Sequence, residues 1–558
     1  MIKNICFLED KEDFEIIFNK IKYENCLFVP LDIKTFLICK KNKLNIFDFN
    51  RYLSNKFHET ALEETKKFTK TIKFKNQLAY SLQSEIVGYL RFRLHSIIFI
   101  IEIIEKILAK YKIDKIFVSG IAKKNHKLHE VKICSEIINE LYPNLTHNLS
   151  RNLHEEKHKE IYKYITNKPL LNKSKKVLLS NGGYNFKRLR KKFKEEGFKT
   201  WISLFGKINF YEKIFYFVKG YNLIHFTIDK KSKVKEKIFI EKINFNYKNK
   251  YNLSNLLNNL NSKLSYYFND LYQKTITLKK FINENNFSLL ISNVARGLDG
   301  AILDHDLKQP SLCIPHGIIS KSLNNYDLLY KKNIAEAVFN GESNYFAIQS
   351  KIMHQSLETH KFRGKPIITG NLIFSHNTNK GNYKNKHLLY ATTLKGFTNM
   401  QYLGVDMFYE FWEILNELND LSKEMKLKII VKIHPQFSTC KNELAKHFKS
   451  LKFTNCRIDK LLKNAFSLVT LSSGTIEDAL NSKVPVILYD YKKRYKQLEC
   501  SSKYRKEESV YYINSKNEIK LLLEQIKESE KPKFDNYIYE GTFNNNFDQK
   551  VLPIINKK

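Results

Sequence analysis

The chain has 558 residues, 43% of them hydrophobic, so it is long enough to bury more than one core and we expect two domains. Lysine and arginine number 95 against 57 aspartate and glutamate, which gives a formal net charge of +38. The eight cysteines are scattered and form no Cys-x-x-Cys pair, which argues against a disulfide framework and a structural zinc site and fits a reducing cytoplasm.

The positive charge can be interpreted in three ways. Lys, Asn, Ile, Phe and Tyr are all overused and the lysines are spread along the whole chain, as AT-rich coding would produce. We favour this composition bias and keep attraction to an anionic membrane surface or acceptor as the alternative. A nucleic-acid partner is not expected, because no basic and aromatic module of a known type is present.

The first third of the chain has α/β character. Residues 26–30 and 35–39 are strand candidates, and the start of the chain lacks the apolar segment of a signal peptide. The most apolar run, 97–104, is interrupted by Glu102 and is shorter than the roughly 20 residues that span a membrane, so it predicts a buried helix. That helix leads into a strand at 115–120, an alternation typical of parallel sheets.

We expect the first domain to cover residues 1–374. A polar stretch at 150–175 is a candidate subdomain break, and 206–275 is a candidate insertion or helical lid. After this segment, regular strands are again expected at 287–293 and 310–317. The Lys- and Asn-rich span 375–386 is the best candidate for a linker in the chain.

Short strand and helix segments alternate through residues 387–530, which predicts a compact second domain with a parallel sheet. The tail, 531–558, should pack back on the first domain or fray. The expected fold class is therefore α/β, with two Rossmann-like domains that face each other across a cleft and an N-terminal extension or insertions.

Two turns of the second domain end strands in polar residues. In 428–435 an apolar run stops at His434 and Pro435, and proline cannot continue the strand pairing. In 467–478 a strand gives way to Ser-Ser-Gly-Thr and an acidic helix start. Hydroxyls and free N–H groups at such a place can bind an anion, and ligands of open α/β sheets bind at the carboxyl ends of strands.

The same segments resemble a known group of proteins. Residues 390–395 (Tyr-Ala-Thr-Thr-Leu-Lys), 431–435 (Val-Lys-Ile-His-Pro) and 471–475 (Leu-Ser-Ser-Gly-Thr) are similar to the donor-binding domain of GT-B transferases of bacterial surface polymers. That group includes polysialyltransferases, capsule Kdo transferases and CDP-glycerol glycerophosphotransferases. Residues 314–317 resemble the His-Gly turn in its acceptor half, and 368–371 resemble the segment before its domain crossover.

The resemblance implies transfer from a nucleotide-activated donor, a cytidine nucleotide in several relatives, without a metal or other cofactor. It assigns the donor phosphate to His434 and the Ser-Ser-Gly-Thr turn, and His434 then has a catalytic role toward the leaving phosphate. Glu477 either accepts a ribose hydroxyl or simply favours the helix start. The full donor-binding set is Thr392, Thr393, Lys395, Lys432, His434, Pro435, Ser472, Ser473, Gly474, Thr475 and Glu477.

A base for the acceptor hydroxyl must come from the first domain, where Asp299 and His316 both lie at strand ends. Each has a plain alternative: a turn or cap aspartate, and a structural histidine. The cluster 304–306 (Asp-His-Asp) is interpreted as a solvated face, because adjacent side chains of one helix diverge and make a poor metal site.

Together these observations predict a metal-independent glycosyltransferase that builds a surface polysaccharide or glycolipid, with a CMP-sugar of the Kdo or sialic acid type favoured. It would act in the cytoplasm, either free or at the inner face of the cytoplasmic membrane, on a glycan or lipid-linked acceptor. A nucleotide-sugar 2-epimerase of the same fold and a non-catalytic scaffold of carbohydrate synthesis are the alternatives.

Overall fold

The structure is a computed structural model. It describes residues 2–72, 74, 78–119, 134–149, 162–166, 175–180, 186–205, 211, 214, 216, 218, 222–228, 253–317, 319–374, 387–391, 408–493, 496–505, 507–528 and 532–556. The expected linker at 375–386 and the turn after residue 391 therefore lie outside the described residues.

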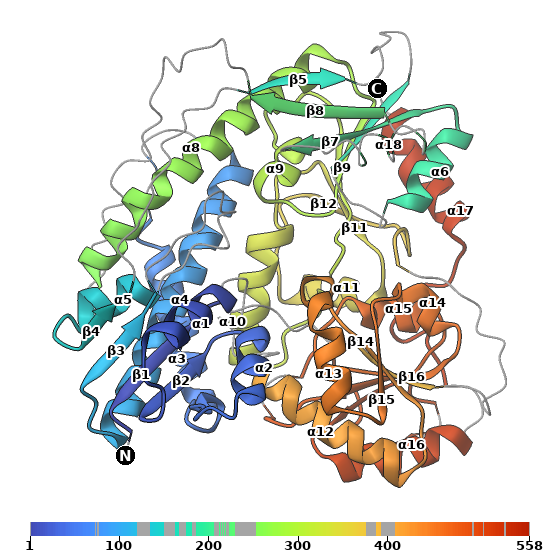
Figure 1. The fold of residues 1–558 in the computed structure, drawn as a ribbon. Helices are drawn as coiled ribbons and strands as arrows, with labels where there is room; N and C mark the ends of the chain where they lie inside the picture. Colours follow the sequence, from blue (N-terminus) through green and yellow to red (C-terminus); the bar gives the residue numbers. More distant parts are fainter. Residues whose placement is uncertain are drawn as a thin grey trace.

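Three β-sheets, almost entirely parallel and covered by helices, form the described part of the molecule (Figure 1). The first has four strands in the order β2-β1-β3-β4. Its elements are β1 (Asn4–Leu8), α1 (Lys11–Lys20), β2 (Cys26–Pro30), α2 (Ile33–Lys41), η1 (Phe49–Arg51), α3 (Asn55–Thr69), α4 (Tyr80–Lys110), β3 (Lys115–Val118), α5 (Cys134–Leu141) and β4 (Thr146–Asn148).

The second sheet has eight strands in the order β12-β11-β10-β9-β6-β7-β8-β5, with β5 antiparallel at the edge. Part of the expected insertion belongs to it, because β8 pairs with β7 in the sheet. Its elements are β5 (Tyr162–Thr166), β6 (Lys176–Leu179), α6 (Lys187–Glu195), β7 (Lys199–Phe205), β8 (Asn222–Ile228), α8 (Ser254–Glu284), β9 (Leu289–Ser292), α9 (Gly297–Gly300), η3 (Ala301–Leu303), β10 (Ser311–Cys313), α10 (Asn325–Ile334), η4 (Ala335–Phe339), β11 (Tyr345–Ile348), α11 (Lys351–Gln355), η5 (Ser356–Glu358) and β12 (Lys365–Ile368).

The third sheet has six parallel strands in the order β15-β14-β13-β16-β17-β18. Its elements are β13 (His387–Ala391), α12 (Phe408–Glu424), β14 (Ile429–Lys432), η9 (Pro435–Cys440), α13 (Lys441–His447), β15 (Leu451–Thr454), α14 (Ile458–Leu462), β16 (Ala465–Thr470), α15 (Thr475–Asn481), β17 (Val486–Tyr489), β18 (Val510–Ile513) and α16 (Lys516–Glu528). The predicted fold class, α/β with two Rossmann-like domains and an N-terminal extension, is thus confirmed, and the extension has a sheet of its own.

The C-terminal tail returns to the second sheet, as one of the two expectations had it. Its helical turns α17 (Phe543–Asn546), η10 (Phe547–Val551) and α18 (Leu552–Asn556) follow the third sheet in the chain. Phe547 and Val551 are fully buried in one cluster with Val177, Leu179 and Phe193 of the second sheet and its helix α6. The chain therefore returns to the second sheet after it has formed the third.

One expected strand, 35–39, is wrong, because these residues lie in helix α2. The Asp32 carboxylate accepts a hydrogen bond from Thr35 N at 2.7 Å, and Thr35 Oγ1 accepts one from Asp32 N at 3.4 Å. This reciprocal capping box starts a helix whatever the apolar content of the run that follows. The predicted buried helix at 97–104 is confirmed and is part of the much longer α4.

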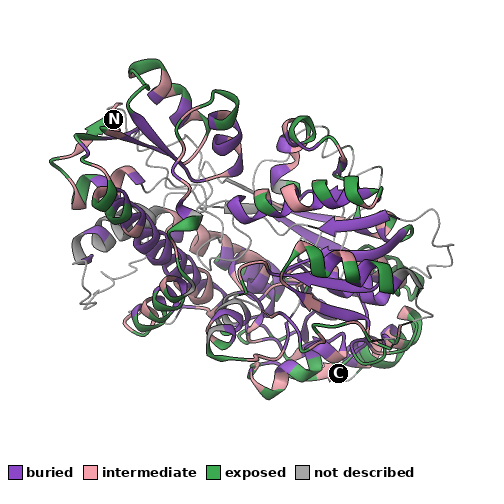
Figure 2. Cartoon of the chain, turned by 90° about the horizontal axis from the view of Figure 1, so that it is seen from below, coloured by how far each residue is buried: buried purple, intermediate pink, exposed green. Residues whose placement is uncertain are grey.

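The N-terminal sheet and its helices pack against the helices of the third sheet as well as those of the second. The ring of Phe36 in α2 lies 5.1 Å from those of Tyr409 and Trp412 in α12, and Tyr409 donates a hydrogen bond to the carbonyl of Phe47 at 2.9 Å. Figure 2 shows buried strands at the centre of the layers and exposed residues on the outer faces of the helices.

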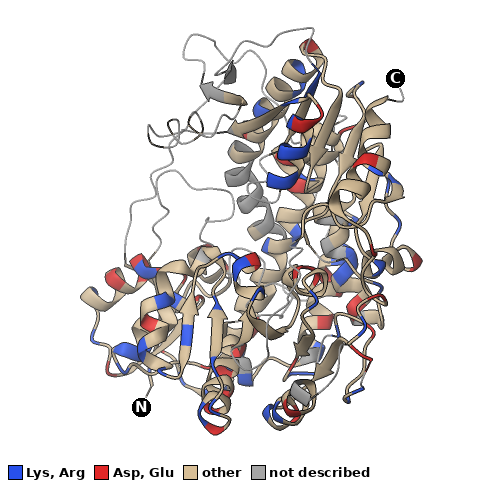
Figure 3. Ribbon diagram, turned by 90° about the vertical axis from the view of Figure 1, so that its right-hand side faces the viewer, with Lys and Arg blue, Asp and Glu red and all other residues tan. Residues whose placement is uncertain are grey.

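Charged side chains are distributed over all three layers. Lys and Arg are interspersed with Asp and Glu along many helices and loops in Figure 3, rather than gathered on one element. Among the helices in the described ranges, none has the length and apolar content that crossing a bilayer requires.

Candidate active site

The third sheet reverses its winding between β13 and β16, because the chain continues from β13 to β14 on one side and from β16 to β17 on the other. Thr470 Oγ1 at the end of β16 donates a hydrogen bond to the carbonyl of Ala391 at the end of β13, at 2.9 Å. Ligands of open α/β sheets bind outside the carboxyl ends of strands at such a switch point. The expected donor residues after β13, namely Thr392, Thr393 and Lys395, lie outside the described residues.

The Ser-Ser-Gly-Thr turn follows β16 at this point. Ser473 is 9% exposed, and its Oγ accepts a hydrogen bond from Thr475 N at 3.3 Å, so this serine supports the start of α15. Ser472 and Gly474 are partly exposed. Because α15 has only seven residues, hydroxyl groups and neighbouring cations, rather than a long helix dipole, are the main groups here that can bind an anion.

Two further expected donor residues follow β14, the strand next to β13. Lys432 ends β14 and is half-buried, while His434 is partly exposed and Pro435 opens η9. Burial lowers the pKa of the Lys432 ammonium group, and the negative charge of Asp478 acts in the opposite direction. A cation and an imidazole therefore lie at the same sheet edge as the Ser-Ser-Gly-Thr turn.

Glu477, the last of the expected donor-binding residues, has a fully buried side chain. Its Oε1 accepts a hydrogen bond at 2.6 Å from Ser350 Oγ, which follows β11 of the second sheet, and its Oε2 has no hydrogen-bond partner among the described residues. Burial raises the pKa of Glu477 to about 8, although the bond from Ser350 acts the other way. Glu477 thus joins the two larger domains in this structure.

On the first-domain side, His316 follows β10 and is exposed. Its Nδ1 lies 3.0 Å from the carbonyl oxygen of Asn293, the residue after β9. Because a carbonyl only accepts, Nδ1 carries the proton, and in the neutral form of the ring Nε2 is the nitrogen that can accept one. The Phe339 ring lies 5.8 Å away and packs edge-on against the imidazole.

Asp299, the other expected base, lies in the short helix α9 after β9 and is partly exposed. In the cluster 304–306, Asp304 and Asp306 both pair with Lys279, at 2.9 Å and 2.8 Å, whereas His305 bonds Glu342 at 2.6 Å. Asp304 is buried, which corrects the expected solvated face at this residue. No group of three metal-ligating side chains is found in the described ranges.

The two sheet edges meet at Gly474. A Cβ atom at this position would lie 3.1 Å from the carbonyl oxygen of His316 and 3.7 Å from Cα of Gly317. Gly474 has an ordinary helical φ of −56°, so glycine is required here by the close approach of the two turns and not by backbone geometry. The structure therefore brings the expected acceptor turn against the expected donor turn.

Three residues at this junction were missed by sequence reasoning. Gln349 donates to the carbonyl of Pro315 at 2.8 Å, which fixes the backbone just before His316. The charge of Asp478 acts on the half-buried Arg188 of α6 across the junction, and on Lys432 within its own domain. Arg188 is one of several basic residues in α6, and Asp478 is typical of an acidic residue in the first turn of a helix. No sequence signal therefore marked either residue as part of a site.

No family model matches the chain, and no curated protein matches it. Among solved structures, proteins with GT-B-like folds are similar to this chain. The UDP-GlcNAc 2-epimerase of Methanocaldococcus jannaschii, in complex with UDP-GlcNAc and UDP, is 14% identical with a TM-score of 0.42, over 69% of this chain and 100% of that chain. TarM of S. aureus is 11% identical with a TM-score of 0.39, over 69% and 100%. The wall teichoic acid polymerase TagF is 14% identical with a TM-score of 0.37, over 69% and 88%. At these low values we base the function on this chain's own residues.

Proposed function

We propose that this protein is a glycosyltransferase that moves a sugar from a nucleotide-activated donor to a surface polysaccharide or glycolipid, with a CMP-sugar of the Kdo or sialic acid type favoured. The observation that supports this most is the approach of Gly474 to the His316 turn, at 3.1 Å for a Cβ atom. It places the carboxyl ends of two parallel sheets against each other, where a donor on one sheet can meet an acceptor on the other.

The donor phosphate binds between His434, Lys432 and the hydroxyl of Ser472. As the bond between the sugar and the phosphate oxygen breaks, the electron pair stays on that oxygen, and these donors stabilise the growing negative charge. Such groups are most effective when they are fixed before the reaction, and the burial of Lys432 and Ser473 holds this edge in place.

His316 removes the proton of the acceptor hydroxyl. The bond from Nδ1 to Asn293 O sets the tautomer, so Nε2 takes the proton while the acceptor oxygen forms the new bond to the sugar. Each proton and electron pair is thereby assigned to a group of this chain or to a substrate, and we expect transfer to continue in the presence of a chelator.

The first test is a thermal-shift screen of the full chain with CMP, CDP, UDP and GDP, followed by transfer assays with the matching nucleotide sugars. We expect cytidine nucleotides to raise the Tm most, and His434→Ala to lower kcat by about 10²–10³-fold. His447→Ala, an exposed histidine at the end of α13, is the matched control.

Each alternative predicts a different result. Conversion of a nucleotide sugar to its epimer without any acceptor would replace the transferase by an epimerase. No Tm response to any of the four nucleotides would favour a scaffold. Full activity of His434→Ala would remove the phosphate role from this residue.

A further inference from the structure

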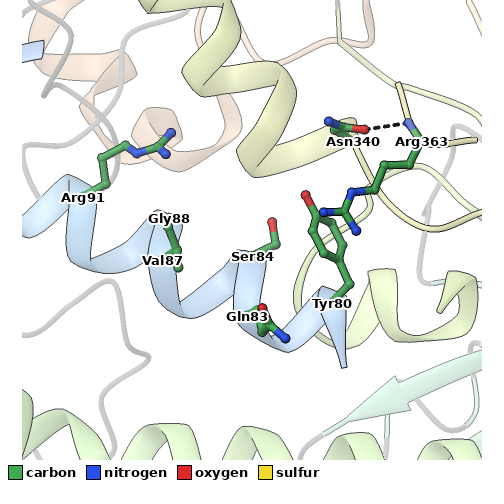
Figure 4. A pocket seen from close by; sticks show the side chains of 8 residues that line it. All are labelled: Tyr80, Gln83, Ser84, Val87, Gly88, Arg91, Asn340 and Arg363. Carbon is green, nitrogen blue, oxygen red and sulfur yellow. Dashed lines mark hydrogen bonds between the residues drawn. The ribbon is translucent and has the colours of Figure 1, made fainter. Parts of the chain in front are cut away.

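A hollow lies along the N-terminal half of α4, apart from the junction at Gly474 (Figure 4). It has a volume of about 270 Å³. Helix α4 contributes one face to it, and the opposite wall is formed by Asn340 after η4 and Arg363 before β12 (Figure 4). The residues of α4 that line it are Tyr80, Gln83, Ser84, Val87, Gly88 and Arg91.

The lining of this pocket differs from the rest of α4. Most of the helix is buried and apolar, with a long run of isoleucines toward its end. The pocket residues recur every three to four positions, as one helical face does, and most of them are polar. Gly88 has no side chain, and a glycine inside a helix costs about 1 kcal/mol relative to alanine. A helix that only fills a core is not expected to carry a polar face with a glycine, Gly88, at its centre.

Two arginines give the pocket its charge, and none of the described residues that line it is acidic. Arg91 is only 6% exposed, so its guanidinium group is held inside the protein. Arg363 is half-exposed, and its guanidinium lies 3.9 Å above the centre of the Tyr80 ring. A guanidinium group presents a rigid fork of N–H donors that matches carboxylate and phosphate oxygens.

The position of Arg363 is set by its neighbours. Its backbone N donates to Asn340 Oδ1 at 2.9 Å, which joins the two residues of this wall. Its Nη1 donates to Glu342 Oε1 at 3.1 Å, so one carboxylate outside the pocket already competes for this side chain. An anion in the pocket would have to compete with Glu342 for the same donors.

The pocket adjoins the acceptor turn. Asn340 directly follows Phe339, whose ring packs on His316 at 5.8 Å between centroids. The neighbouring face of α4 is tied to α9 and η3: Glu85 pairs with Arg296 at 3.4 Å, and Ser81 Oγ donates to Asp304 at 2.7 Å. The pocket is therefore fixed relative to both base candidates, Asp299 and His316.

We propose that this pocket binds an oxyanion-bearing sugar unit of the acceptor, carrying a carboxylate or a phosphate, and thereby directs the acceptor chain to His316. That the bound sugar belongs to an acceptor rests on the proposed function. The pocket itself does not, because most of the residues that line it come from α4, which belongs to the N-terminal extension. Arg363 binds the anion, Arg91 adds positive charge at the other end of the hollow, and the amides and hydroxyl of Gln83, Ser84 and Asn340 match sugar hydroxyls (Figure 4). The volume fits a group no larger than a monosaccharide.

Isothermal titration calorimetry of the full chain with three probes tests this site: glucuronic acid for the carboxylate, glucose 6-phosphate for the phosphate, and glucose as the neutral reference. We expect millimolar or tighter binding of at least one anionic sugar and at least tenfold weaker binding of glucose. Binding of glucuronic acid alone would assign a carboxylate, and binding of glucose 6-phosphate alone would assign a phosphate.

Three variants locate the binding. Arg363→Gln removes one cation, Gly88→Leu fills the gap, and both should weaken binding of the anionic sugar at least tenfold. Glu342→Gln removes the carboxylate that competes for Arg363, so it should strengthen binding. Arg457→Gln is the matched control, because Arg457 is also a half-exposed arginine paired with a carboxylate, Asp459, at 2.7 Å, but lies on the third sheet.

The results separate this inference from the proposed function. If neither anionic sugar binds, if glucose binds equally well, or if Arg363→Gln and Gly88→Leu both match Arg457→Gln, the pocket assignment is overturned. The nucleotide thermal-shift screen is run on the same proteins. A normal CMP response with no anionic-sugar binding removes only the pocket, and the reverse pattern removes only the donor half. Far-UV circular dichroism and Tm identify a variant that fails to fold, and the other variant then decides.

Discussion

The two turns that meet at Gly474 differ in how their side chains are held. On the third sheet, Glu477 is fully buried and Ser473 is 9% exposed. On the second sheet, His316 is exposed, and its ring contacts the carbonyl oxygen of Asn293 and the ring of Phe339. The turn on the third sheet is therefore fixed by packing, whereas the His316 side chain is exposed.

This difference matches two different tasks. A leaving phosphate is stabilised best by groups that do not have to reorganise when charge develops, and the buried Ser473 and Glu477 hold the turn that carries Ser472 in place. A base must reach a hydroxyl that arrives on a separate substrate, so it has to remain accessible. The comparison can be tested by changing each side in turn.

The largest effect is expected at the exposed side. His316→Ala removes the proposed base and should lower kcat/KM by about 10²–10⁴-fold without changing Tm by more than a few degrees, because the ring is exposed. Transfer kinetics and a thermal melt of the same protein measure this. Activity within threefold of the unmodified protein would move the base role to another group, with Asp299 next to be tested.

An intermediate effect is expected where the two sides touch. Gly474→Ala places a Cβ atom 3.1 Å from the His316 carbonyl oxygen, and Gly474→Val adds two more carbons at the same point. Pushing the turns apart should destabilise the protein by about 1–3 kcal/mol and slow transfer, more for valine than for alanine. Urea unfolding and kcat for the pair give the graded response. Equal behaviour of both variants and the unmodified protein would show that the turns are not in contact.

The smallest effect on catalysis is expected on the buried side, at Glu477. Its pKa is raised to about 8 by burial, above the ordinary value of 4.5. The folded state then binds a proton that the unfolded state has released, so this group's contribution is full below about pH 4.5 and is lost as pH rises toward 8. The loss should be on the order of 1 kcal/mol per pH unit within that window.

Glu477→Gln should abolish this pH dependence and leave kcat within a few-fold, since glutamine can still accept the bond from Ser350. Free energies of unfolding at pH 5, 6, 7 and 8 for both proteins provide the comparison. Parallel curves for the two proteins would contradict the raised pKa, and a large loss of kcat would instead restore the expected contact between Glu477 and the nucleotide.

Sequence reasoning was most successful where strands end in unmistakable polar residues. Alternating apolar segments predicted β14, β16 and α15 within a few residues, and Pro435 marked the end of a strand. It failed at 35–39, because a short apolar run is equally compatible with a strand and a buried helix, and the capping box at Asp32 decided for the helix. Unambiguous local signals therefore predict the secondary-structure elements. Where local signals compete, the tertiary structure decides between a strand and a helix.

The site was predictable only in part for the same reason. His316, His434 and the Ser-Ser-Gly-Thr turn follow strands, so their place at a sheet edge could be inferred. The burial of Glu477 against Ser350 depends on a contact between residues 127 positions apart, which no local pattern encodes. Arg188 and Gln349 are likewise recognisable only from what packs against them.

The return of the C-terminal tail has a mechanical consequence. The chain passes to the third sheet after Gly370, which has a φ of +64°, and comes back to the second sheet before Asn546. A Cβ atom on Gly370 would lie 2.4 Å from Asn546 Nδ2, so the outgoing and returning segments touch. The contact between Gly370 and Asn546 therefore fixes the start of the outgoing connection and the end of the returning one to each other. Any relative movement of the two larger domains that separates these two residues has to break this packing.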